Sequence, residues 1–159
     1  MSREYLVLDN SLLSAFAAAE WFDSIEFWAT DYDIVTTDRV WSREFEPHHG
    51  VARPGWLETE AVDITNLDSR PVELGGADWS LIRLADSVDD AILVSNDGRL
   101  GDEADARGIE HIWGAKFLIQ TFQACGIDSH SYEVGLPVFI DDVPMPESVI
   151  DELHNAEKE

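Results

Sequence analysis

Short apolar segments alternate with helical segments along this chain of 159 residues, and this alternation constrains the fold more than any other feature. Strand-like apolar runs occur at residues 4–8, 34–36, 91–95 and 109–113. Helical spacing of apolar residues occurs at residues 12–19, 24–29, 39–46, 77–85, 99–107 and 114–126. Strands separated by helices form parallel crossover units, so we expect an α/β fold, a three-layer sandwich with a central parallel sheet.

Proline and glycine residues set the expected ends of several elements. Pro47 is expected to stop the helix at residues 39–46, which Thr37 or Asp38 would cap at its start. Gly108 stands at the position where a left-handed residue closes a helix. The pattern weakens from residue 48 to residue 75, where only one short strand, at residues 61–64, is expected.

The segment after Ile127 differs from the rest of the chain. It contains Pro137, Pro144 and Pro146, and we expect a strand at residues 138–140 and a short acidic helix. Because 159 residues with 45% hydrophobic content bury one sizeable core but hardly two, we expect one compact unit. Residues 1–126 would form the main domain, and residues 127–159 a C-terminal extension packed on that domain.

The chain is strongly acidic, with 33 Asp and Glu residues and a formal net charge of −23. Its six tryptophans argue against disorder, because disordered acidic chains lack the aromatic residues that form a core. Lysine occurs only at Lys116 and Lys158, and scarce lysine with abundant carboxylates is typical of proteins from a salt-adapted cytosol. The alternative is an acidic protein from an ordinary cell that binds a basic partner.

The chain has one cysteine, Cys125, so it has no intrachain disulfide. No basic leader precedes the first apolar run, and no apolar run approaches the ~18 residues that a membrane span needs. We therefore expect a cytoplasmic protein without membrane contact.

Two aspartates lie just past strongly apolar runs. Asp9 directly follows residues 4–8, and Asp97 is the second residue after residues 91–95. In parallel α/β sheets, ligands bind beyond the carboxyl ends of the strands. The structural alternative is that each aspartate caps the helix that follows. Capping explains Asp97 better than Asp9, because Asn10 or Ser11 is able to cap the first helix.

Glu44 and Asp78 lie on the apolar stripes of two predicted helices. Glu44 follows Val40 and Trp41 by one helical turn, and Leu81 and Ile82 follow Asp78 at the same spacing. Asp78 is equally well explained as an N-terminal charge favoured by the helix dipole. Several buried anions repel one another unless they share a cation, so the four carboxylates together indicate a metal site.

Oxygen ligands without cysteine or paired histidine favour Mg²⁺ or Mn²⁺ over Zn²⁺. Such ions hold a scissile phosphate, activate water and neutralise the leaving oxygen. Arg39 and Arg43, beside Glu44, are candidates for phosphate contact, although pairing with nearby acids explains them equally well. Trp41, Trp79 and Trp113 are suited to stack bases, but core packing is the preferred interpretation.

Four stretches in this order resemble the PIN-domain ribonucleases, which occur as toxins of type II toxin–antitoxin pairs and in RNA processing. They are Tyr5-Leu6-Val7-Leu8-Asp9-Asn10-Ser11, Trp41-Ser42-Arg43-Glu44-Phe45, Gly76-Ala77-Asp78-Trp79-Ser80-Leu81 and Leu93-Val94-Ser95-Asn96-Asp97-Gly98-Arg99-Leu100. The resemblance covers roughly residues 4–125. It excludes the tail after Ile127, and the segment at residues 48–75 has fewer helical signals than the family shows there.

The resemblance implies that Asp9, Glu44, Asp78 and Asp97 bind Mg²⁺ or Mn²⁺. It implies that Ser11 and Asn96 are hydrogen-bonding neighbours, with Asp102 as a fifth acidic group, and that the protein forms a homodimer. The leading hypothesis is an endoribonuclease that cleaves RNA, with a toxin role and an antitoxin partner as one version of it. The alternatives are a PIN-fold scaffold that no longer cuts and a structure-selective DNA nuclease.

Overall fold

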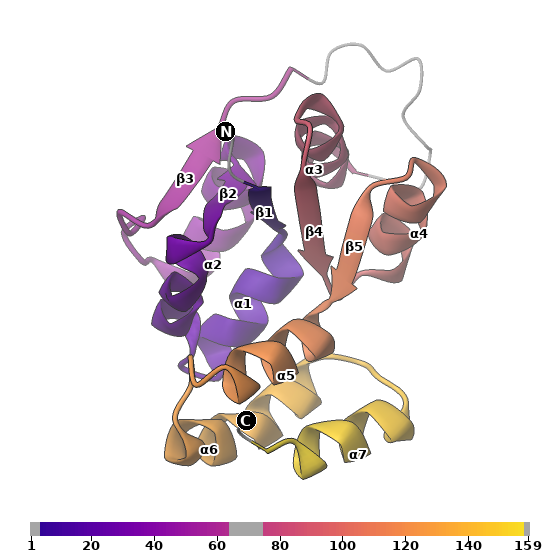
Figure 1. The fold of residues 1–159 in the computed structure, drawn as a ribbon. Helices are drawn as coiled ribbons and strands as arrows, with labels where there is room; N and C mark the ends of the chain where they lie inside the picture. Colours follow the sequence, from indigo (N-terminus) through magenta and orange to yellow (C-terminus); the bar gives the residue numbers. More distant parts are fainter. Residues whose placement is uncertain (1–3, 64–74, 158–159) are drawn as a thin grey trace.

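The computed structural model describes residues 4–63 and 75–157, which form an α/β fold around a five-stranded, all-parallel sheet (Figure 1). The strands are ordered β3-β2-β1-β4-β5. Their bounds are β1 Glu4–Leu8, β2 Tyr32–Thr37, β3 Leu57–Glu60, β4 Ala91–Ser95 and β5 Glu110–Trp113. The predicted three-layer α/β class and parallel sheet are confirmed.

Helices connect the strands and cover the sheet. They are α1 Asn10–Ala18, the 3₁₀-helix η1 Phe22–Thr30, the π-helix η2 Val40–Phe45, α2 Glu46–His49, α3 Gly76–Ser87, α4 Gly98–Ala106, α5 Gly114–Gln123, α6 Ser129–Asp142 and α7 Glu147–Asn155. In Figure 1, α3 and α4 accompany β4 and β5, α1 and α2 accompany the other three strands, and α5, α6 and α7 lie together below the sheet. No helix in the described part of the chain is long and apolar enough to cross a membrane.

The core lies where the apolar strands meet in register. Leu6 of β1 is opposite Ile34 of β2 and Ile92 of β4, and Val7 is opposite Val35 and Leu93 in the same way. All of these side chains are buried, as expected for parallel strands covered on both faces. The continuous apolar runs in the sequence therefore predicted β1 and β4 to within a residue.

The strand order reverses direction between β1 and β4. From β1 the chain moves outward through β2 to β3, and it then returns to β4 on the other side of β1 and continues to β5. In open α/β sheets, ligands bind beyond the carboxyl ends of the strands at such a reversal of strand order. Asp9 and Asp97 follow the carboxyl ends of β1 and β4.

The helix after β2 differs from its prediction. Thr37 caps it as expected, because its hydroxyl accepts the Val40 N–H at 3.2 Å. Pro47 does not end it: the chain continues from the π-helical turn into α2 and stops at Gly50, which has a φ of 61°. The wider turn suits a proline that has no N–H to contribute, and left-handed Gly50 then closes the helix.

The predicted strand at residues 61–64 was wrong. The strand is β3, Leu57–Glu60, which pairs with β2 at the edge of the sheet, and residues 61–63 have no regular structure. Residue 64 lies outside the described residues. Leu57 is fully buried while Glu58 is exposed, so this short strand has an alternating pattern, and its acidic side chains suit a sheet edge.

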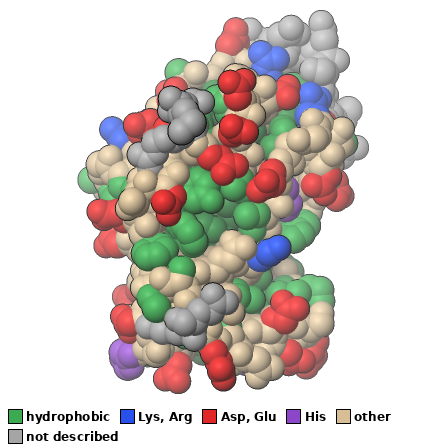
Figure 2. All heavy atoms as spheres, in the orientation of Figure 1, with side chains coloured by type: hydrophobic (Ala, Val, Ile, Leu, Met, Phe, Trp, Pro, Cys, Tyr) green, Lys and Arg blue, Asp and Glu red, His purple; other side chains and the backbone are tan. Residues whose placement is uncertain are grey.

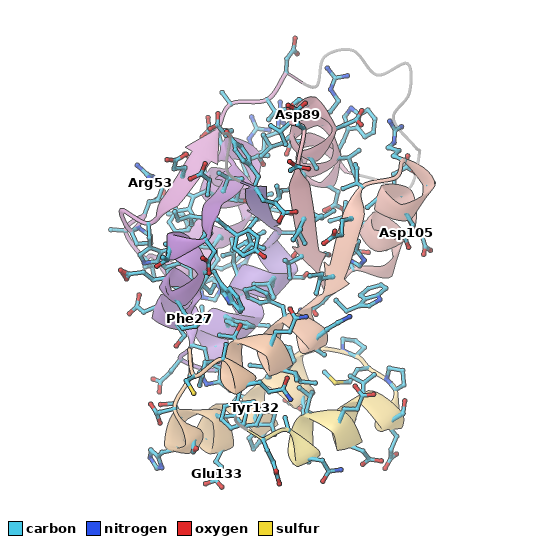
Figure 3. All side chains as sticks on the ribbon, in the orientation of Figure 1. Phe27, Arg53, Asp89, Asp105, Tyr132 and Glu133 are labelled. Carbon is cyan, nitrogen blue, oxygen red and sulfur yellow. The ribbon has the colours of Figure 1, made fainter. Side chains whose placement is uncertain are left out.

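The predicted strand at residues 138–140 was also wrong, because these residues belong to α6, which contains Pro137. The buried residues Tyr132, Leu136 and Phe139 are four and three positions apart, which is helical spacing. α6 packs against α1. Its Tyr132 lies between the terminal helices in Figure 3 and donates a hydrogen bond to the Leu153 carbonyl of α7 at 2.5 Å.

Candidate metal centre

Two aspartates cap the helices that follow β1 and β4. Asp9 has an extended backbone and accepts the Leu12 N–H at 2.9 Å, and Asp97 accepts the Arg99 N–H at the same distance. The expectation that Asn10 or Ser11 caps the first helix was therefore wrong, and the capping role applies to both aspartates. An aspartate is a strong N-cap because its oxygen satisfies a helix N–H that has no other partner.

Asp9 is a buried carboxylate, with only 3% of its surface exposed. The Ser11 hydroxyl lies 2.7 and 2.9 Å from its two oxygens, and the Ser95 hydroxyl donates to Oδ2 at 2.5 Å. Burial raises the pKa of Asp9 from an ordinary 3.8 to about 6, although hydrogen bonds from Ser95, Leu12 and Ser11 act in the opposite direction. Even fully hydrogen-bonded, this anion is costly to keep at neutral pH.

The other three predicted carboxylates are partly buried and act electrostatically on one another. Burial, followed by the negative charge of Asp78, raises the pKa of Glu44. Burial, followed by the charge of Asp97, raises the pKa of Asp78, whose charge in turn raises the pKa of Asp9. Four acidic residues from distant parts of the sequence thus share one electrostatic neighbourhood.

Hydroxyl groups on the strand ends fix the helices that carry these acids. Thr37 Oγ1 caps the helix of Glu44 and lies 2.7 Å from Ser80 Oγ on α3, the helix of Asp78. Thr36 donates to the Leu8 carbonyl at 2.7 Å, which ties β2 to the end of β1 just before Asp9. Because these hydroxyl groups are buried, their hydrogen bonds are costly to break and hold the three elements in register.

Ser95 connects the two capping aspartates, and the sequence analysis missed it. Its hydroxyl donates to Asp9 and accepts the Asp97 N–H at 2.9 Å. Its position as the last residue of β4, polar and next to Asn96-Asp97, is the sequence signal that would have identified it. One buried hydroxyl thus sets the position of the backbone at Asp97 relative to the carboxylate of Asp9.

The predicted supporting residues Ser11 and Asn96 are neighbours in the structure. Ser11 Oγ accepts the Asn96 N–H at 3.0 Å while it donates to Asp9, and the Asn96 amide lies 3.5 Å from the Ser11 carbonyl. Ser11 therefore contacts a predicted carboxylate directly. Asn96 acts on Asp9 only through Ser11.

The remaining predicted residues lie less close to the centre. Asp102 is exposed, and its charge acts on His111, whose pKa is lowered by burial and raised by Asp105 and Asp102. Arg43 is exposed and Arg39 partly buried. The basic residue whose charge lowers the pKa of Asp78 is Arg99, which the sequence analysis did not propose.

The predicted tryptophans have different environments. Trp41 and Trp79 are buried in the core, as the preferred interpretation held. Trp113 is 47% exposed, so the core interpretation was wrong for this residue. It ends β5, where the strand leaves the sheet and the chain turns into α5.

The donor set suits a hard divalent cation. Asp9, Glu44, Asp78 and Asp97 offer carboxylate oxygens alone, and burial together with mutual repulsion destabilises their charged forms, which a cation would reverse. However, among residues 4–63 and 75–157, no three acidic, histidine or cysteine side chains are close enough to hold one ion. The four acids therefore influence one another electrostatically, but in this arrangement they are too far apart to bind the same ion.

No known protein family, curated protein or solved structure matches this chain.

Proposed function

We propose that the protein is a metal-dependent endoribonuclease of the PIN-like type, with its centre at the carboxyl ends of β1 and β4. The observation that supports this best is the electrostatic link of Asp9, Glu44, Asp78 and Asp97 across four separate elements. Helix capping gives Asp9 and Asp97 a structural role, but it gives no reason for the partly buried Glu44 to lie where the charge of Asp78 acts on it.

The four carboxylates would hold Mg²⁺ or Mn²⁺, which when bound supplies Lewis acidity toward water and the scissile phosphate. Glu44, Asp78 and Asp97 are partly exposed, so their side chains have more freedom to adjust to a cation than a buried side chain has. Asp9 has no such freedom, because its oxygens accept three hydrogen bonds. Asp9 would therefore be the fixed ligand, with Glu44, Asp78 and Asp97 as the adaptable ones.

The reaction is hydrolysis: the oxygen of water bonds to phosphorus, one phosphorus–oxygen bond of the RNA backbone breaks, and the departing oxygen takes up a proton in place of the one that water loses. The products are one end with a phosphate group and one end with a hydroxyl group. Arg99 lies where its positive charge acts on Asp78, so it is suited to contact the scissile phosphate. Ser11 and Ser95 orient Asp9 and keep its oxygens in place. Below about pH 6 the Asp9 carboxyl holds a proton and loses its affinity for a cation.

The net charge of −23 opposes binding of RNA, which is a polyanion. Figure 2 shows acidic side chains spread over the visible face, with few basic ones among them. In concentrated salt this repulsion is screened, so RNA binding would depend on the cation, base stacking and local arginines. The strongly acidic surface therefore suits a protein that works in a cytosol with a high salt concentration.

A second candidate, a scaffold that no longer cuts, is favoured by one observation. Asp9 and Asp97 both cap helices, so each has a structural reason to be an aspartate that requires no metal. Asp78 lies in the first turn of α3, where the helix dipole favours an acid, so it too has a structural reason that requires no metal. Neither capping nor the dipole accounts for Glu44, which lies inside a helical segment, so the nuclease explains one more residue than the scaffold does.

The experiment that separates these candidates is a cleavage assay on single-stranded RNA in molar potassium chloride, with and without Mn²⁺. Cleavage that requires Mn²⁺ supports the nuclease. Millimolar Mn²⁺ should also raise the melting temperature of the RNA-free protein. At a Mn²⁺ concentration a hundred times the dissociation constant, the free energy of unfolding should increase by about 2.7 kcal/mol. If Mn²⁺ produces no cleavage and no stabilisation, the nuclease is rejected and the scaffold is favoured.

A further inference from the structure

An apolar pocket of about 520 Å³ opens beside the candidate metal centre. One wall comes from the ends of β4 and β5, through Asn96, Gly98 and Trp113. The other comes from the C-terminal extension, through Met145 and Val149 among others. A volume of this size lies within the range of small-molecule and cofactor sites.

The pocket carries no charge on any of its nine described lining residues, although about one residue in five of this chain is acidic. A surface at −23 offers few places where a polyanion meets no carboxylate. Trp113 stands in this uncharged area with 47% of its surface exposed. The His111 ring lies 4.5 Å from the Trp113 ring at an angle of 83° and fixes the indole in an edge-to-face contact.

The Asn96 amide brings one polar group to this apolar wall. A Cβ on Gly114 would lie 2.0 Å from Asn96 Oδ1, so the glycine lets the amide pack directly against the backbone. The Asn96 N–H is held by Ser11, the same residue that hydrogen-bonds Asp9. Asn96 and Gly98 also flank Asp97 in sequence. The pocket thus begins one residue from a predicted metal ligand.

We propose that this pocket binds an unpaired nucleobase of the nucleotide next to the scissile phosphate, with the base stacked on Trp113. This inference rests on the proposed nuclease function. An exposed indole binds the π-face of any base, and an amide offers both a donor and an acceptor to the base edge. A nucleobase is uncharged and flat, which suits a pocket of uncharged walls. The C-terminal extension then forms part of the substrate site.

The test measures binding of a single-stranded RNA hexamer in EDTA and molar potassium chloride, where neither a metal nor phosphate attraction contributes. Trp113→Ala should weaken binding roughly tenfold or more, since base stacking of this kind is removed with the ring. Trp113→Phe should restore most of the affinity. Phe27→Ala is the matched control, because Phe27 is a similarly exposed aromatic, 41%, on η1 (Figure 3).

A second pair of variants tests the opposite wall. Val149→Trp fills the pocket from α7 and should abolish binding, whereas Ile150→Trp adds the same ring at a neighbouring position outside the lining and should not. Fully paired duplex should bind weakly, since its bases are not free to enter. Equal binding by the wild type, Trp113→Ala and Val149→Trp, or equal binding of duplex and single strand, would overturn the proposal. Single-stranded DNA should bind as RNA does, because the pocket contacts the base.

The failure of this inference is distinguishable from failure of the nuclease proposal. Mn²⁺-dependent cleavage with the same KM in the wild type and Trp113→Ala rejects the pocket and keeps the nuclease. Pocket-dependent binding of the hexamer without cleavage rejects the nuclease and supports a site for unpaired bases. A raised KM with an unchanged kcat in Trp113→Ala supports both. If the wild-type protein binds neither the single-stranded RNA hexamer nor single-stranded DNA, the pocket proposal is rejected.

Discussion

The ends of β1 and β4 have the same local pattern, an apolar strand that leads through an aspartate cap into a helix, but the two aspartates have different surroundings. Asp9 is almost completely buried and receives hydrogen bonds from Ser11, Leu12 and Ser95. Asp97 is partly exposed, and its side chain accepts the Arg99 N–H. Similar sequence patterns thus produce one rigid, costly anion and one adaptable anion.

This difference assigns complementary roles to the two residues. A carboxylate held by three donors keeps its position whether or not a ligand is present, whereas a partly exposed one moves toward a ligand. Ser95 joins them, because its hydroxyl contacts the carboxylate of Asp9 and the backbone of Asp97. The comparison leads to four predictions, in decreasing order of expected effect.

The largest effect is expected on cleavage. Asp9→Asn and Asp97→Asn should each reduce RNA cleavage at least about a hundredfold, because loss of a ligand exceeds the 10–100-fold typical for loss of its supporting neighbours. Asp102→Asn is the control, since Asp102 is an exposed acid on the same helix as Asp97. Cleavage that survives in both variants would end the nuclease assignment.

The second effect concerns stability and pH, and separates the two aspartates. Because the pKa of Asp9 rises from 3.8 on folding to about 6, the native state binds an extra proton between these values. This contribution to stability is fully present below 3.8 and is lost as pH rises through about 6, a total of about 3 kcal/mol. Burial of Glu44 and Asp78 acts in the same direction.

Urea denaturation between pH 4 and pH 7 measures this contribution. Asp9→Asn should remove about 2 kcal/mol of the difference in unfolding free energy between these pH values, which is most of the total, whereas Asp97→Asn should leave most of that difference. Equal pH dependence in the two variants would mean that Asp9 is not the costly anion that its burial indicates.

The third prediction concerns the residue that connects the two sites. Ser95→Ala removes a hydrogen bond to buried Asp9 and leaves the Asp97 N–H without its acceptor, so it should cost about 1–3 kcal/mol of stability. Ser87→Ala is the control: Ser87 is exposed and donates only to the Leu84 carbonyl, so its loss should stay within about 0.5 kcal/mol. Similar losses in both variants would remove Ser95 from the centre.

The smallest effect on stability distinguishes capping from metal binding at Asp97. Asp97→Ser keeps an oxygen that accepts the Arg99 N–H, and should change the unfolding free energy by only a few tenths of a kcal/mol, while Asp97→Ala should cost about 1 kcal/mol. Both should lose cleavage. If Asp97→Ser stays active, Asp97 is a cap and no ligand.

The sequence predicted the central strands well because burial on both faces gives them continuous apolar runs, as in Leu6-Val7-Leu8 and Ile92-Leu93-Val94. It failed at the edge, where β3 alternates a buried Leu57 with exposed Glu58 and resembles loop in an acid-rich chain. It also failed in α6, because the local β-branched composition at residues 138–140 outweighed the helical spacing of Tyr132, Leu136 and Phe139.

For the site, the sequence indicated residue types but not partners. The four candidate acids were selected by their position against the apolar pattern, either after an apolar strand or on the apolar stripe of a helix, because both positions are recognisable in the sequence alone. Ser95 and Arg99 were not, because a hydroxyl at a strand end and an exposed arginine become informative only when the contact is known. Trp113 was misjudged because exposure depends on what neighbouring elements leave uncovered.

The aromatic contacts of α6 determine whether the C-terminal extension is removable without exposing the core. Tyr132 stacks on Trp21 and on Phe122, and Phe139 meets Phe16 edge to face. These rings come from both sides of residue 127, so a fragment that ends there would leave Phe16, Trp21 and Phe122 facing water. Expression of a shortened chain should therefore yield insoluble material, and partner screens or crystallisation trials need residues 127–157 in place.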